Sequence, residues 1–101
     1  MAWCTHLLPK LAAGETVKCR PRGNSMTPKI FSGNLCTISP YKSTDVLSKG
    51  DIVLCKVHGA YYLHLVTAVR ADQVQISNNH GHVNGWTTVS NVFGKLEKVE
   101  P

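Results

Sequence analysis

The sequence predicts a mainly β protein in which small coiled antiparallel sheets form a partly open barrel. Short apolar runs alternate with polar residues, and Gly or Pro ends most of these runs. Residues 51–58 (DIVLCKVH) alternate most clearly, with Val53, Cys55 and Val57 on one side of the expected strand. Gly59 permits a tight turn into residues 61–70, so residues 51–70 are expected to form a β-hairpin.

The other elements follow from the same pattern. Further strands are expected at residues 16–20, 34–39, 73–77 and 91–99. Residues 1–14 are expected to form a short amphipathic or irregular arm, and residues 15–101 to form the folded domain. Residues 26–31 fit a helical turn, since Pro28 is tolerated at the start of a helix. Residues 78–86 are rich in Asn, Gly and His and are expected to be a loop.

Composition and charge limit the class of protein. The chain has 101 residues, 43% of them hydrophobic and 17% charged, which is typical of one globular domain. Its net charge of +5 would suit a nucleic acid, but the positive residues are scattered, so a solvated basic surface is the favoured interpretation. The apolar stretch at residues 3–13 is interrupted and far shorter than the ~20 residues that span a bilayer. The four cysteines form no metal-binding spacing, and we expect a cytoplasmic protein with reduced thiols and no membrane partner.

The segment GNSMTP at residues 23–28 carries the main functional signal. Gly23 and Pro28 place Ser25 on a sharp turn where its hydroxyl can stand free of a sheet. Backbone N–H groups of Asn24, Ser25 and Met26 would converge there, as an oxyanion hole requires. Considered alone, a serine in such a turn is more often ordinary turn chemistry.

Three segments together resemble one family. GNSMTP at residues 23–28, KGDIVLCKV at 49–57 and YLHLV at 62–66 are similar, in order and spacing, to the LexA and type I signal peptidases. The resemblance implies the LexA/signal-peptidase fold and a soluble serine endopeptidase with Ser25 as nucleophile. His64 falls at the position of the general base, where endoplasmic-reticulum-type signal peptidases also have His. It also implies a protein or peptide substrate bound as an extended strand, with Arg20, Arg22 and Tyr62 along the groove, and no cofactor.

The sequence departs from this family at the group that orients the base. The His-containing relatives have an Asp after the next strand, but residues 77–86 contain no carboxylate. Asn78, Asn79 or Asn84 could hold the imidazole instead, as Asn does in some Cys–His enzymes. The alternative is a catalytically degenerate peptide- or repressor-binding module of the same fold. In that case His64 would be only a half-buried strand residue.

Two further questions stay open in the sequence. His80 and His82 alternate and could both face a metal ion, but no third ligand has a suitable spacing, so no metal site is expected. The sequence is compatible with a homodimer, and it does not identify the substrate.

Overall fold

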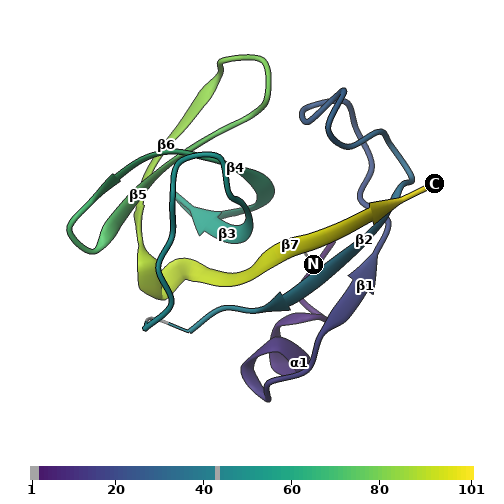
Figure 1. The fold of residues 1–101 in the computed structure, drawn as a ribbon, viewed down its shortest axis with the longest axis horizontal. Coiled ribbons are helices and arrows are strands. Elements are labelled where there is room, and N and C mark those ends of the chain that lie inside the picture. Colours follow the sequence, from purple (N-terminus) through teal and green to yellow (C-terminus); the bar gives the residue numbers. More distant parts are fainter. Residues whose placement is uncertain (1–2, 43) are drawn as a thin grey trace.

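The computed structural model describes residues 3–42 and 44–101 (Figure 1). Within these residues the elements in chain order are α1 (Leu8–Ala12), β1 (Val17–Cys19), β2 (Leu35–Pro40), β3 (Ile52–Val57), β4 (Ala60–Arg70), β5 (Gln73–Ser77), β6 (Val83–Thr88), the 3-10 helix η1 (Val89–Asn91) and β7 (Val92–Glu100). The expected strands are therefore present, each within two residues of its expected ends.

The strands form one coiled sheet. Their order is β1-β2-β7-β3-β4-β5-β6, and every neighbouring pair is antiparallel. The sheet twists strongly without closing, so that β1 and β6 remain as edges (Figure 1). The prediction of a mainly β, antiparallel protein is confirmed. The expectation of several small sheets is wrong, because β7 crosses between β2 and β3 and joins the two halves.

The core lies on both faces of this sheet, and β3 contributes to both. Leu54 belongs to a cluster with residues of α1, β1 and β2, whereas Val53, Cys55 and Val57 belong to a second cluster with residues of β4 and β5. This division follows from the alternation of side chains along a strand and confirms the pattern expected for residues 51–58.

The β3–β4 hairpin has the expected position and fixes the register of His64. Val53 pairs with His64 and Cys55 pairs with Tyr62. On the other side of β4, pairing with β5 begins only at Leu65. Residues 60–64 therefore leave one backbone edge of β4 unpaired within the described part of the chain.

Two local expectations had different outcomes. Residues 26–31 contain the expected turn, closed by the hydrogen bond from the Ile30 N–H to the Met26 carbonyl, and the one α-helix of the described chain is α1, inside the expected arm. This short helix forms because Leu7 and Leu11 are buried against the sheet. The expectation for residues 78–86 was wrong, because they are not all loop: β6 begins at Val83 and pairs with β5. Val83, Trp86 and Thr87 are good strand formers, and pairing outweighs the poor propensity of Asn84 and Gly85.

Candidate active site

Ser25 lies in a turn that is anchored by its neighbours. Met26 and Ile30 are only 4% and 5% exposed and belong to the first core cluster. The N–H of Ile30 donates to the carbonyl of Met26 at 3.0 Å and closes the turn between them. Ser25 itself is exposed, so the buried methionine fixes the backbone while the hydroxyl beside it stays accessible.

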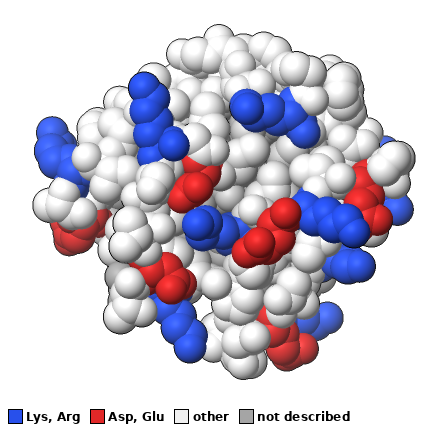
Figure 2. All heavy atoms as spheres, viewed as in Figure 1, with Lys and Arg blue, Asp and Glu red and all other residues white. Residues whose placement is uncertain are grey.

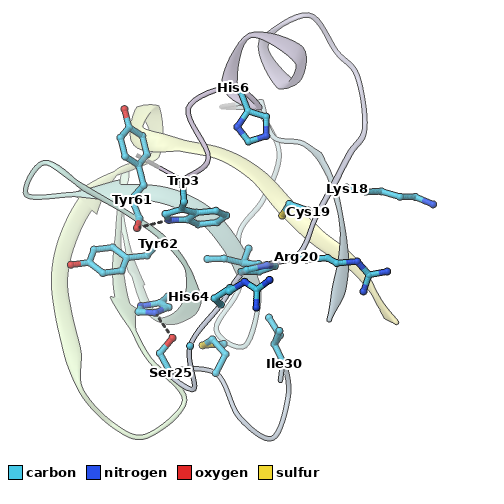
Figure 3. Close-up of a pocket in the computed structure, with 15 residues that line it drawn as sticks. Trp3, His6, Lys18, Cys19, Arg20, Ser25, Ile30, Tyr61, Tyr62 and His64 are labelled. Carbon is cyan, nitrogen blue, oxygen red and sulfur yellow. Dashed lines mark hydrogen bonds between the residues drawn. The ribbon is translucent and has the colours of Figure 1, made fainter. Parts of the chain in front are cut away.

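His64 approaches this hydroxyl from the second strand of the hairpin. Its Nε2 lies 3.0 Å from Ser25 Oγ (Figure 3). The imidazole is 7% exposed and stacks on the ring of Tyr62, with the centroids 4.7 Å apart and 29° between the planes. Burial and stacking together hold the ring in one orientation, as a general base requires.

Asn84 fixes the other ring nitrogen. Its Oδ1 lies 2.7 Å from His64 Nδ1. An amide oxygen can only accept, so Nδ1 carries the proton, and in the neutral ring Nε2 is left free to accept the Ser25 proton. This is the tautomer that a histidine base needs.

A β-bulge brings Asn84 to this place. Ile76 pairs with Gly85 and Ser77 pairs with Val83, which leaves Asn84 without a partner on β5. Bulges often occur beside active sites because the extra residue turns its side chain in a new direction. Gly85 has a φ of +137°, and a Cβ there would lie 2.8 Å from His58 Nε2, so this position favours glycine.

The protonation state of His64 follows from these surroundings. Burial lowers the pKa of His64 below the ordinary value of 6.5, since desolvation disfavours the charged ring. The hydrogen bond to Asn84 raises the pKa in opposition, and His82 lowers it further. The net direction is downward, so the imidazole is neutral and able to accept a proton at pH 7.

The other two asparagines considered from the sequence do not touch the imidazole. Asn78 Oδ1 accepts the N–H groups of His80 and His82 at 2.8 and 2.9 Å. Asn79 contacts the Ser25 turn, where its N–H donates to the Ser25 carbonyl at 2.8 Å. Of the three candidates, only Asn84 orients His64.

Sequence reasoning missed His80. Its Nε2 lies 3.0 Å from the carbonyl oxygen of Asn24 and 3.0 Å from Thr27 Oγ1. The pairing of a loop histidine with a turn more than fifty residues away leaves no pattern in the sequence.

Within residues 3–42 and 44–101, no three His, Cys, Asp or Glu side chains gather as metal ligands.

Two of the backbone N–H groups expected at an oxyanion hole make no hydrogen bond within the described part of the chain. The backbone N–H groups of Ser25 and Met26 donate to no acceptor among the described residues. The carbonyl of Asn24 accepts from Thr27 Oγ1 at 3.0 Å, so Asn24 helps to hold the turn.

A pocket of about 670 Å³ opens beside the two catalytic candidates. Arg20, Arg22 and Tyr62 all line it, as the resemblance implied, together with Trp3, Met26, Leu63 and other residues (Figure 3). Residues that follow β1 form one wall and the beginning of β4 forms another. No Asp or Glu lines the pocket, whereas elsewhere, on the face shown in Figure 2, acidic and basic groups are interspersed.

The pocket also contains a thiol, Cys19, which does not suit catalysis. Burial, together with smaller effects of the neighbouring Cys36 and Cys4, raises the pKa of Cys19 to about 11, so the thiolate is scarce at pH 7. The chain's cysteines are all free. Cys19 is therefore not an activated thiol, whereas the Ser25 hydroxyl in the same pocket contacts a histidine.

Comparison with known proteins adds no assignment. The described residues contain no helix long and apolar enough to cross a membrane. No protein-family model matches the chain, and no curated protein matches its sequence. Function therefore has to be inferred from the geometry of Ser25, His64 and Asn84.

Proposed function

We propose that this protein is a serine endopeptidase of the LexA/signal-peptidase superfamily that cuts a protein or peptide substrate with Ser25 and His64. The observation that supports this most is the continuous series of hydrogen bonds from Ser25 Oγ through His64 to Asn84, at 3.0 and 2.7 Å. A nucleophile, a base and a group that orients the base are the parts that acyl transfer requires. The four free thiols are compatible with a cytoplasmic setting.

The first half of the reaction would form an acyl-enzyme. Ser25 Oγ attacks the carbonyl carbon of the substrate while its proton passes to His64 Nε2. The oxyanion accepts hydrogen bonds from the N–H groups of the Ser25 turn. As the intermediate collapses, the C–N bond breaks, and the imidazolium returns the proton to the leaving amine.

The second half would release the acyl group. His64 takes a proton from a water molecule, and the resulting hydroxide adds to the ester carbonyl on Ser25. The ester C–O bond then breaks, and the imidazolium returns the proton to Ser25 Oγ. The acyl group leaves as a free carboxylic acid, and the site is restored.

The walls of the pocket support an extended peptide as substrate. Residues 20–23 belong to no strand, and residues 60–64 lack a partner on the side of β5. The indole N–H of Trp3, which lines the pocket, donates to the carbonyl of Tyr61 at 3.5 Å, so this edge accepts a hydrogen bond from the pocket side. A peptide lying between the two segments would hydrogen-bond to backbone on both sides.

One observation favours a second candidate function. Asn84 is neutral and stabilises an imidazolium less well than a carboxylate does. A protein that kept the pocket but lost efficient catalysis would bind peptides or a repressor without cutting them.

Reaction with a fluorophosphonate probe separates the two candidates. We expect the wild-type protein to form a covalent adduct, Ser25→Ala to form none, and His64→Ala to react at least about a hundredfold more slowly. Ser48→Ala is the matched control, because Ser48 is exposed and does not line the pocket. Equal labelling of the wild type and Ser25→Ala, or no labelling of either, would favour the binding module.

A further inference from the structure

We propose that residues 78–82 brace the nucleophile, with Asn79 and His80 as positioning residues that set the distance between Ser25 and His64. This inference rests on the proposed function, because it concerns the same reaction.

Four polar contacts join the brace to the Ser25 turn. The N–H of Asn79 donates to the Ser25 carbonyl at 2.8 Å, and Asn79 Nδ2 donates to the Thr27 carbonyl at 3.0 Å. His80 Nε2 contacts both the Asn24 carbonyl and Thr27 Oγ1, each at 3.0 Å. Three of the four backbone carbonyls at residues 24–27 therefore accept hydrogen bonds from residues 79 and 80. The fourth, that of Met26, accepts one from the N–H of Ile30.

The brace is itself ordered by a side chain. Asn78 Oδ1 accepts the N–H groups of both His80 and His82, and the N–H of Asn78 donates to the His82 carbonyl at 2.9 Å. Such a closed turn resists bending, so a displacement of residue 79 or 80 would be transmitted to Ser25. Figure 1 shows the two segments at the same end of the molecule, one following β5 and the other following β1.

The chain just after the brace orients the base. Asn84, which orients His64, lies on the bulge two residues after the brace. The nucleophile and the base come from distant parts of the sequence, but one short segment contacts both. Because a misplacement of about 1 Å can cost roughly a hundredfold in rate, such shared support matters for catalysis.

The contact of His80 defines its role as a donor. The Asn24 carbonyl can only accept, so His80 Nε2 carries a proton, and Thr27 Oγ1 donates to the same carbonyl. A glutamine in place of His80 retains an N–H donor, whereas alanine does not. This difference provides a conservative variant for rescue.

The test measures the rate of fluorophosphonate labelling across pH. We expect His80→Ala and Asn79→Ala to lower the plateau rate about tenfold or more, and His80→Gln to restore most of the loss. The pH of half-maximal rate stays unchanged in these variants, because burial and Asn84 set the pKa of His64. Ser48→Ala is the control, since Ser48 is exposed and lies outside both the pocket and the brace, and it should keep the plateau rate. Plateau rates of His80→Ala and Asn79→Ala within twofold of wild type would overturn the brace, as would a shift of the half-maximal pH together with the plateau.

A second measurement does not depend on catalysis. NMR of the wild type should find the Nε2–H tautomer of His80 and slow hydrogen exchange of the Asn79 amide, and His80→Ala should accelerate that exchange. A rapidly exchanging Asn79 amide in the wild type would refute the brace even if Ser25 is labelled. Conversely, a protected amide in a protein that no probe labels would refute the proposed function and leave the contact between the two segments in place.

Discussion

Asn84 Oδ1 accepts a hydrogen bond from His64 Nδ1 at 2.7 Å, and Asn84 is the one residue of β6 that a bulge leaves without a partner on β5. The bulge therefore places an amide where it can orient the imidazole, and this amide takes the place of the missing carboxylate. Since the hydrogen bond fixes the tautomer, the free Nε2 points its lone pair at Ser25 Oγ.

A carboxylate at this position should strengthen the base. In Asn84→Asp the negative charge beside Nδ1 favours the imidazolium, so the pKa of His64 rises and the plateau rate of fluorophosphonate labelling increases about tenfold. The pH–rate profile measures both effects. Asn78→Asp is the control, because Asn78 contacts backbone N–H groups and not the ring. An unchanged profile in Asn84→Asp would mean that residue 84 does not orient the base.

The wild-type rate should have its acid limb below pH 6.5. Burial lowers the pKa of His64, so the ring remains an unprotonated base under mildly acidic conditions in which a solvent-exposed histidine would be charged. The labelling rate should therefore fall to half only below pH 6.5. An inflection above pH 6.5 would contradict this assignment.

The same lowered pKa makes stability fall with acid. The unfolded chain, whose His64 has the ordinary pKa, binds a proton at a higher pH than the folded chain does. The free energy of unfolding therefore falls as the pH drops below about 6.5, until the folded-state pKa is passed. Urea denaturation at pH 7.5 and pH 5 should show a larger loss for wild type than for His64→Gln. Equal losses in the two proteins would count against a buried, neutral histidine.

The charge of the pocket should select among peptides. Lys18, Arg20 and Arg22 line it, no Asp or Glu does, and none of the three forms an ion pair within the described chain. We expect peptides with a Glu near the scissile bond to be cut roughly twofold to fivefold faster than matched peptides with Lys, at low salt. Arg20 Nη1 already donates to the Gly33 carbonyl, so Arg22 is the better residue to vary.

The matched variants are Arg22→Gln and Lys49→Gln. Arg22→Gln removes a pocket charge and should reduce the preference for Glu, whereas Lys49 is exposed and does not line the pocket. A preference that is the same in both variants and insensitive to salt would argue against recognition by these cations.

Gly85 should be needed for the bulge that presents Asn84. Its φ is +137°, and a Cβ would lie 2.8 Å from His58 Nε2. Gly85→Ala should lower the free energy of unfolding by about 1–3 kcal/mol and slow labelling as Asn84 moves. Gly14→Ala is a control for backbone strain alone, since its φ is +88° with nothing near the added Cβ. Adding His58→Ala to Gly85→Ala should recover part of the loss, and no recovery would show that the clash is unimportant.

The sequence was sufficient for the parts of the site that depend on local pattern. The alternation around Val53 and the turn at Gly59 set the hairpin register, which places His64 on its strand. The GNSMTP segment located the turn of Ser25. The mainly β architecture also followed, because apolar alternation and Gly or Pro boundaries are local features.

The remaining parts of the site depend on contacts between distant segments. A bulge has no reliable sequence pattern, so Asn84 could not be distinguished from Asn78 and Asn79. The start of β6 was missed because Asn84 and Gly85 disfavour strands and only pairing with β5 stabilises them. The contact of His80 with the Ser25 turn likewise depends on the folded sheet.

Peptide cleavage tests the central claim most directly. A proteome-derived peptide pool is incubated with the wild type, Ser25→Ala and His64→Ala, and new peptide termini are identified by mass spectrometry. The proposed mechanism predicts products that only the wild type generates in quantity, because the ester forms on Ser25 and His64 must accept its proton. Identical sets of termini from the wild type and Ser25→Ala would contradict it.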